Sequence, residues 1–436
     1  MSKRQREYSL VLSHPMTEMP LDKFFLQKTD QCVMCGLCLP HCPTYKLYNA
    51  ENESPRGRIA LMRALTTGEL TLTPSLTAHL DRCLVCRACE NACPANVPYS
   101  ELIDITRTVI NKETAVAQRR TKPETILNNL SHLKRWRPLL TLYQRSGLQK
   151  AARTLRLPQI LGLAQLEQLI PKLPAQNKWH EHYPATGIQR GQVALFTGCT
   201  GKILDGVTLT AAIKILTRLG YSVTIPPAQG CCGILHKHSG YPNEARKLAL
   251  NNLKSFQTDQ LDAVIYIASG CGSQLKEYKN LAGLDQQHQE QAQLFSSKTQ
   301  EINQFITSVT WPADFKLSPL NKRVAVHVPC SMQYTPDLPD TCQTALKKIP
   351  QLTVMSLPDN HHCCGAAGDY MLRHPDIAGA LLKPKLDTLE QLNPDIITSA
   401  NIGCALHFMA ALEEKRNSIE VVHPVSLLAR QITDRQ

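Results

Sequence analysis

The chain has 436 residues, of which 43% are hydrophobic and 19% are charged, and its formal net charge is +12. This composition is that of a folded globular protein and excludes disordered and collagen-like classes. The length suggests about two to four domains. The positive charge is spread over a long chain without the signature of a nucleic-acid-binding module, so no nucleic-acid partner is expected.

The N-terminus carries Lys3, Arg4 and Arg6 among its first residues and lacks the apolar stretch that a secretory signal requires. No run of about 18 apolar residues occurs elsewhere, so no transmembrane helix is expected. We therefore expect a cytoplasmic protein without a signal peptide, which can attach to the inner membrane only peripherally.

The seventeen cysteines form three groups along the chain. Eight lie between Cys32 and Cys93, four between Cys199 and Cys271, and five between Cys330 and Cys404. Because the cytosol keeps thiols reduced, this number of cysteines indicates metal or redox chemistry rather than disulfides.

Two runs in the first group share the pattern C-x2-C-x2-C-x3-C-P, which is typical of two-cluster bacterial ferredoxins. In that arrangement three cysteines of one run and the last cysteine of the other run hold each [4Fe-4S] cluster. The predicted ligands are Cys32, Cys35, Cys38 and Cys93 for cluster 1, and Cys83, Cys86, Cys89 and Cys42 for cluster 2. Zinc is the alternative, but two complete runs with the trailing proline make it the weaker interpretation.

A 39-residue insertion separates the two runs and contains Arg56 and Arg58. These two arginines either tune the cluster potentials by their charge or are ordinary surface or ion-paired residues. Farther along, residues 119–156 contain ten Lys or Arg and a single acidic residue, Glu124. This pattern indicates either a basic amphipathic helix for an anionic membrane or a partner, or a solvated basic face.

Beyond this linker the chain repeats itself, from about Gln192 to Leu284 and again from about Arg323 to Leu412. Each copy has three strand-like runs with helical stretches between them, and each run leads to cysteine, with Cys-Cys-Gly after the second. Because loops after parallel strands meet at one edge of a sheet, we expect one site per copy. The candidate metal ligands are Cys199, Cys231, Cys232 and Cys271 in the first copy, and Cys330, Cys363, Cys364 and Cys404 in the second.

Cys342 has no counterpart in the first copy and is interpreted as an ordinary buried thiol. The predicted fold class is mixed α+β and α/β, with a helical two-[4Fe-4S] ferredoxin-like domain followed by two small α/β Cys-Cys-Gly domains. The expected boundaries are 1–110 for the ferredoxin-type domain, 111–190 for the basic helical linker, 191–320 for the first Cys-Cys-Gly domain and 321–436 for the second.

This layout resembles the iron-sulfur subunit of bacterial glycolate oxidase over nearly the whole chain. Related chains occur in heterodisulfide reductase, in anaerobic glycerol-3-phosphate dehydrogenase and in lactate-oxidising complexes. The resemblance implies a glycolate (2-hydroxy acid) dehydrogenase in which FAD-containing partner subunits oxidise glycolate to glyoxylate. This chain would pass the electrons on to a quinone or another membrane acceptor, and it would not be catalytic alone.

The heterodisulfide reductase version of the repeat ends in C-x-x-C, but here Gln274 and His407 occupy the position of the fifth cysteine. Four cysteines can still hold an additional iron-sulfur cluster or a zinc ion, and His407 is a weak candidate for a further ligand. The sequence is equally compatible with His407 being an ordinary helix histidine that binds no metal. The absent thiolates count against the disulfide chemistry of that family.

The chain contains no G-x-G-x-x-G fingerprint after a strand and no complete P-loop, so flavin is expected on partner subunits only. Two other classes are the alternatives, a stand-alone thiol-disulfide reductase and a cluster-bearing regulatory protein that binds nucleic acid. These residues do not distinguish glycolate, D-lactate and glycerol-3-phosphate as the substrate, because the substrate would bind to another subunit.

Overall fold

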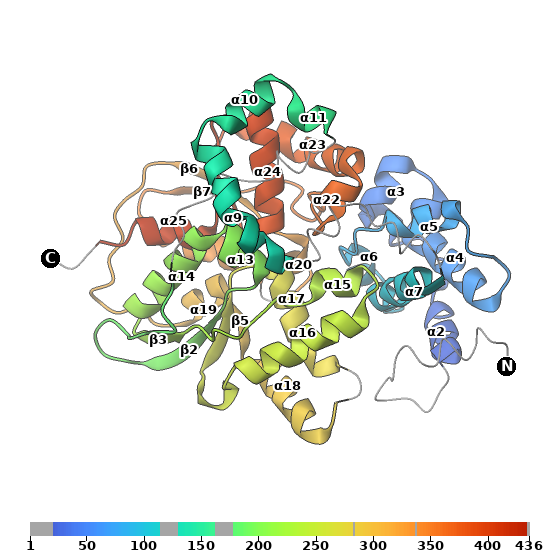
Figure 1. Cartoon of the computed structure of the whole chain (residues 1–436), viewed down its shortest axis with the longest axis horizontal. Coiled ribbons are helices and arrows are strands. Elements are labelled where there is room, and N and C mark those ends of the chain that lie inside the picture. The colour runs from blue at the N-terminus through green and yellow to red at the C-terminus, as the bar shows by residue number, and fades with distance from the viewer. Residues whose placement is uncertain (1–20, 114–129, 162–177, 282–283, 336–337, 434–436) are drawn as a thin grey trace.

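The structure is a computed structural model that describes residues 21–113, 130–161, 178–281, 284–335 and 338–433. A helical N-terminal part, in blue, lies beside two units that each contain a parallel sheet (Figure 1). The predicted fold class is confirmed by this arrangement. The four domain boundaries expected from the sequence stay a prediction.

The N-terminal part consists of short helices around a small apolar core that includes Met62, Leu80 and Leu102. Ser54 begins one of these helices by accepting a hydrogen bond from the backbone N–H of Gly57, and Pro55 occupies its first turn. The elements are α2 (Leu21–Thr29), η1 (Leu39–His41), α3 (Pro43–Tyr48), η2 (Glu51–Glu53), α4 (Pro55–Thr67), α5 (Pro74–Asp81), α6 (Ala88–Asn91) and α7 (Tyr99–Glu113).

The predicted basic segment is helical where the structure describes it, in α9 (Leu130–Arg145), α10 (Leu148–Thr154) and α11 (Leu157–Ile160). Residues 119–129 of that segment lie outside the described residues. Arg153 of α10 forms an ion pair of 2.9 Å with Glu413, and Figure 1 shows α10 and α11 at the outer edge of the molecule. The segment therefore contacts both repeats, since α9 packs against α13 (Cys199–Leu204) of the first repeat and α10 pairs with the second.

The first repeat contains a five-stranded sheet in the order β1-β3-β2-β4-β5, parallel except for β1. Each cysteine-bearing loop follows one of the three central strands, as the sequence predicts. The strands are β1 (His182–Tyr183), β2 (Gly191–Phe196), β3 (Tyr221–Thr224), β4 (Ala263–Tyr266) and β5 (Thr299–Glu301). The helices are α13 (Cys199–Leu204), α14 (Gly206–Arg218), α15 (Ile234–His238), α16 (Pro242–Ser255), α17 (Ser269–Lys276), α18 (Gln286–Lys298) and α19 (Ile302–Ser308), with the turns η4 (Thr258–Gln260) and η5 (Glu277–Asn280).

The second repeat contains a fully parallel four-stranded sheet in the order β7-β6-β8-β9. Its central strand β6 corresponds to β2 of the first repeat. The strands are β6 (Arg323–His327), β7 (Thr353–Ser356), β8 (Ile396–Ser399) and β9 (Glu420–Val422). The helices are α20 (Cys330–Gln333), α21 (Thr341–Leu346), α22 (Tyr370–Arg373), α23 (Pro375–Leu392), α24 (Ile402–Glu414) and α25 (Pro424–Arg430).

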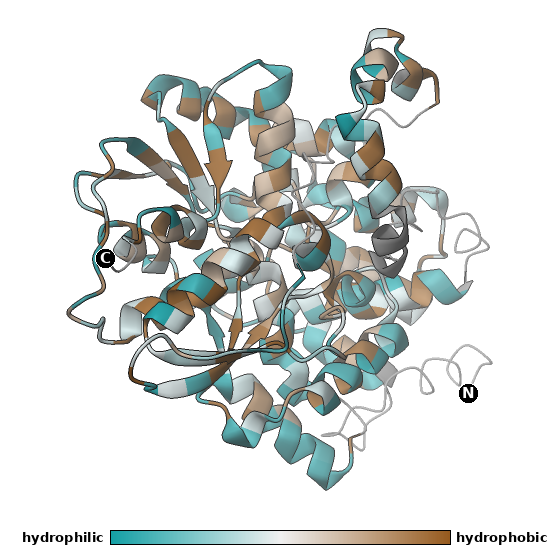
Figure 2. Ribbon diagram, turned by 60° about the vertical axis from the view of Figure 1, so that its left-hand side comes forward, coloured by the Kyte–Doolittle hydropathy of each residue, from teal (hydrophilic) through white to brown (hydrophobic). Residues whose placement is uncertain are grey.

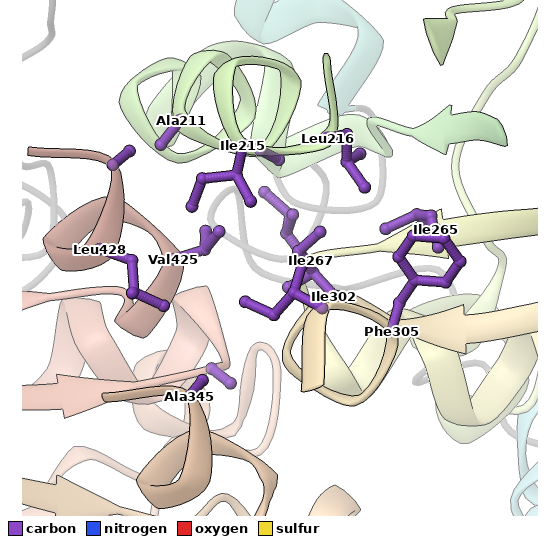
Figure 3. Packing of buried hydrophobic residues seen from close by; sticks show 14 of the residues in the cluster. Ala211, Ile215, Leu216, Ile265, Ile267, Ile302, Phe305, Ala345, Val425 and Leu428 are labelled. Atoms are coloured by element: carbon purple, nitrogen blue, oxygen red, sulfur yellow. The ribbon is translucent and has the colours of Figure 1, made fainter. Parts of the chain in front are cut away.

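The two repeats share one hydrophobic core, to which both sheets and the helices α14, α19, α21 and α25 contribute. In Figure 3, Ile215 of α14 lies near Val425 of α25, and Ile267 lies between the two repeats. Figure 2 shows that the strands are predominantly hydrophobic, whereas the outer helices alternate between hydrophobic and hydrophilic residues. Cys342 is fully buried in this shared core, which agrees with the interpretation of an ordinary buried thiol.

Ion pairs join the N-terminal part to both repeats. Asp81 accepts hydrogen bonds from Arg373 at 2.8 Å and contacts His374 at 3.0 Å, both in the second repeat. Asp104 of α7 pairs with His238 of the first repeat at 3.0 Å. These contacts fix the ferredoxin-type cysteines relative to the cysteines of the repeats.

Candidate metal centres

The four predicted ligands of cluster 1 line one small cavity of the N-terminal part. Cys32, Cys35, Cys38 and Cys93 all border it, together with Arg56 and Tyr99. Burial raises the pKa of Cys38 to about 11, and the nearby thiols of Cys32 and Cys42 add to this effect. The structure therefore brings Cys93 of the second run beside the three cysteines of the first run, as the predicted exchange of ligands requires, and Cys89 borders the same cavity.

The four predicted ligands of cluster 2 also lie together. Burial raises the pKa of Cys89 well above its ordinary value, and the neighbouring thiols of Cys86, Cys83 and Cys42 raise it further. Tyr99 donates a hydrogen bond to the sulfur of Cys83 at 3.5 Å. Tyr99 thus lies between the two sets of cysteines, since it also borders the cavity of cluster 1.

Arg56 and Arg58 are both ion-paired, and both lie close to the cysteines. Arg58 is buried and donates hydrogen bonds to the Glu53 carboxylate at 2.6 Å and to Thr44 Oγ1 at 2.9 Å. Thr44 Oγ1 lies 3.3 Å from the sulfur of Cys42. Arg56 pairs with Glu51 at 2.7 Å and donates to the carbonyl oxygen of Met34. The ion-paired interpretation therefore holds, and it places two cations beside the clusters.

In the first repeat, the loops after β2, β3 and β4 bring four thiols to one place. The sulfur atoms of Cys199 and Cys231 are 3.5 Å apart. Contacts with Cys231 and Cys271, together with burial, raise the pKa of Cys232 well above its ordinary value. Sequence reasoning from the carboxyl ends of parallel strands predicts this convergence, and the structure has it.

The second repeat has the same arrangement, and three of its four cysteines are buried, compared with one in the first repeat. The pKa of Cys330 is raised well above its ordinary value by its contact with Cys363 and by burial. The pKa of Cys364 is also raised, because burial and the contact with Cys404 outweigh the contact with Cys363. This site adjoins the predicted ligands of cluster 2, since Cys86 borders the same cavity as Cys330 and Cys363.

One cavity of about 830 Å³ joins the two repeat sites and cluster 2. Ser331, next to Cys330, donates a hydrogen bond of 2.7 Å to Ser269, which precedes Cys271 by two positions. The two repeat sites are therefore neighbours across this cavity. The cysteines that border it are Cys83, Cys86, Cys199, Cys231, Cys232, Cys271, Cys330, Cys363, Cys364 and Cys404.

Sequence reasoning missed His327, the last residue of β6. One of its ring nitrogens lies within 4.8 Å of the sulfur atoms of Cys364 and Cys404, and the residue is buried. Burial lowers the pKa of His327 well below its ordinary value, and the nearby charge of Lys385 lowers it further. The cysteine motifs do not indicate this histidine, because only the pairing of β6 with β8 in the sheet places it near the site.

The two residues at the position of the fifth cysteine are both buried helix residues. The Nδ1 atom of His407 lies 3.0 Å from the carbonyl oxygen of Cys364, and burial lowers the pKa of His407 to about 4. In the first repeat, Oε1 of Gln274 is buried and has no hydrogen-bond partner among the described residues. The role of His407 as a ligand stays a prediction.

The donor sets fit soft metal groups. Four crowded, largely buried thiols cannot ionise together unless a cation compensates their charge, and thiolates select iron-sulfur clusters, zinc or copper(I). When bound, such a group supplies a one-electron carrier if it is iron-sulfur, or a structural tetrahedral centre if it is zinc. The assignment of individual cysteines to clusters stays a prediction.

Two protein families match the chain. Residues 28–97 match the family described as 4Fe-4S dicluster domain, and residues 193–276 and 324–409 each match the family described as Cysteine-rich domain. Both matches cover the cysteines whose geometry is given above.

Relatives with known names match over most of the chain. The probable glycolate oxidase iron-sulfur subunit of Bacillus subtilis is 33% identical, covering 91% of this chain and 92% of the relative. The glycolate oxidase iron-sulfur subunit of Escherichia coli is also 33% identical, and the match covers 90% of this chain and 92% of the relative. Lactate utilization protein A of Anoxybacillus flavithermus is 28% identical over 54% of this chain and 98% of its own length.

The fold and the cysteine sites define an iron-sulfur protein in which a 4Fe-4S dicluster domain precedes two cysteine-rich domains. The chain belongs to the family of glycolate oxidase iron-sulfur subunits. The resemblance stated from the sequence is thereby confirmed. None of the helices in the described part of the chain combines the length and the apolar character needed to cross a bilayer.

Proposed function

We propose that this chain carries electrons within a complex that oxidises glycolate to glyoxylate. FAD on partner subunits would take two electrons from the 2-hydroxy acid, and this chain would deliver them singly to a quinone-type acceptor. The names of the relatives support the substrate class. D-lactate is a second substrate under this proposal, supported by the shorter match to lactate utilization proteins.

The proximity of Cys86 to Cys330 and Cys363 is the single observation that carries the electron-transfer role. Under our ligand assignment, cluster 1 and cluster 2 are neighbours because they exchange ligands, and cluster 2 is next to the second repeat site. The carriers then form a continuous series that ends at the 830 Å³ cavity. This cavity is our proposed exit for electrons.

Peripheral attachment to the inner membrane is part of the same proposal. The helices α9 to α11 carry large exposed side chains beside the basic residues Arg145, Lys150 and Arg156. A surface of this kind favours an anionic bilayer. The exposed apolar residues are Leu139, Leu142, Leu148, Leu155, Leu157, Ile160 and Leu161.

The decisive experiment is anaerobic purification of the tagged chain from its native cell, followed by EPR after addition of glycolate. Glycolate-driven cluster reduction with co-purifying flavin subunits is the expected result. Reduction by lactate or glycerol-3-phosphate but not by glycolate would reassign the substrate, and clusters that no hydroxy acid reduces would overturn the electron-transfer role.

A second candidate, a heterodisulfide reductase-like activity, is favoured by the cavity between the two repeat sites. Gln274 and His407 stand against it, because they replace the thiolates of the fifth position. Disulfide turnover by the isolated chain with a reduced dye would establish this alternative.

A further inference from the structure

The two repeats differ at one pair of residues beside their metal sites. Phe196 ends β2 and pairs with Tyr266 on β4, whereas His327 ends β6 and pairs with Ser399 on β8. In both repeats the first residue of the pair precedes the first cysteine of its site by three positions. The chain thus has two aromatic residues in one copy and an imidazole with a hydroxyl in the other.

This imidazole is held as metal-binding histidines are. Its Nδ1 atom lies 3.1 Å from the hydroxyl oxygen of Ser399, and its ring meets the Phe408 ring edge to face, with centroids 5.1 Å apart. Metal-ligating histidines typically use their second nitrogen for a hydrogen bond of this kind, which fixes the tautomer and the ring orientation. Because Nδ1 is occupied by Ser399, Nε2 is the nitrogen available to a metal.

Two sulfur atoms lie near this ring. A ring nitrogen and the sulfurs of Cys364 and Cys404 all lie within 4.8 Å of one another, in the interior of the protein. By contrast, Phe196 offers no ligand atom in the first repeat. His407, whose Nδ1 atom contacts the carbonyl oxygen of Cys364, does not belong to this set of three ligand atoms.

We propose that His327 is a ligand, through Nε2, of the metal group in the second Cys-Cys-Gly site, which therefore has a mixed nitrogen and sulfur shell. The inference rests on the proposed function, in which this site holds a metal group. The first site has no equivalent nitrogen at this position. Imidazole is a neutral ligand, whereas each cysteine thiolate brings a negative charge to the site.

The test compares the full-length protein, purified anaerobically, with two single variants. H327F installs the residue that the first repeat has at this position, and H407Q is the matched control that removes another buried histidine next to the same cysteines. Metal content and circular dichroism are measured for each protein first. X-ray absorption then detects imidazole at iron or zinc, and pulsed EPR on protein labelled with ¹⁵N-histidine detects a metal-bound nitrogen.

We expect the histidine signal in the wild type and in H407Q, and its loss in H327F. Loss in H407Q with retention in H327F would overturn the proposal in favour of His407, and a signal that survives both substitutions would exclude both histidines. A second route does not require H327F to fold. The variant F196H, made together with Y266S, should add a histidine signal to the first site.

The same measurements separate this inference from the proposed function. A C363A/C404A double variant that contains as much metal as the wild type would show that the second site holds none. Such a result would overturn both the metal-site proposal and the ligand. If the double variant loses metal but no protein shows a histidine signal, the proposal that His327 is a ligand is overturned and the metal-site proposal stands.

Discussion

Lys385 of α23 distinguishes the second Cys-Cys-Gly site electrostatically from the first. It is buried, and its Nζ donates a hydrogen bond of 2.8 Å to the carbonyl oxygen of Asp359. Burial lowers the pKa of Lys385, and the nearby thiols of Cys364, Cys363 and Cys404 oppose this shift. The residue in the corresponding turn of α16 is Asn252, which donates to the carbonyl oxygen of Cys231 at 2.9 Å. A buried cation therefore adjoins one site, and a neutral amide adjoins the other.

The charge at Lys385 should raise the reduction potential of the second site, because it stabilises the more negative reduced state. We expect K385N to lower that potential by on the order of 50 mV, as estimated for one charge at close range in a medium of intermediate dielectric. Redox titration followed by EPR measures the shift. The control K385R keeps the charge and should retain the potential, so an equal shift in both variants would contradict an electrostatic cause.

Glu301 introduces a pH dependence of stability. Burial raises its pKa to about 7, although it accepts hydrogen bonds from the backbone of Asn303 and Gln304. An unfolded chain ionises the same carboxyl near pH 4.3. Between these two values only the unfolded state gives up the proton, so the free energy of unfolding falls as the pH rises.

We expect the wild type to lose about 2 kcal/mol relative to E301Q between pH 5.5 and pH 7.5, from the 1.36 kcal/mol that each pKa unit contributes. Anaerobic thermal unfolding of both proteins at several pH values measures the difference. The comparison uses the slope of the free energy of unfolding against pH, so a constant difference in stability caused by the substitution does not affect it. Parallel curves would refute the raised pKa.

At the scale of elements, the segment α9–α11 combines exposed apolar side chains with basic ones. Leu155 and Ile160 are 64% and 74% exposed. Burying one such side chain in the interface of a bilayer contributes about 1.5 to 3 kcal/mol. The segment therefore carries enough apolar surface to control membrane attachment.

We expect L155D/I160D to bind anionic vesicles at least about tenfold more weakly than the wild type, since the charges would enter the interface with the acyl chains. Co-sedimentation with vesicles of anionic and of neutral lipid measures the affinity. Ile188 is 89% exposed and lies in another part of the molecule, so I188D is the matched control. Equal losses in both variants would show that attachment does not use this segment.

The cysteine runs and the repeat could be predicted from the sequence because their signals are local spacings. His327 could not, since only the pairing of β6 with β8 places it beside Ser399 and near Cys404. The core common to both repeats was also not predictable. An apolar face on α14 indicates that the helix is buried, but it does not indicate that α25 of the other repeat covers it.

For the whole molecule, the position of Cys86 on the same cavity as Cys330 and Cys363 predicts an order of electron transfer. We expect C363A to leave substrate-driven reduction of the ferredoxin-type clusters intact and to slow transfer to the final acceptor by at least about tenfold. Stopped-flow absorbance of the purified complex follows both steps. The equivalent variant C231A in the first repeat is the control, and a larger defect there would reverse the proposed order.

The packing of α25 against α14 also has a consequence for biosynthesis. The first repeat completes its core only when a helix made roughly two hundred residues later has docked. While the ribosome is still elongating the chain, the apolar face of α14 that α25 covers therefore stays exposed, whereas Cys232 packs in a separate core of first-repeat residues. A chain truncated before α25 should therefore expose this apolar face and aggregate more readily than the full-length chain.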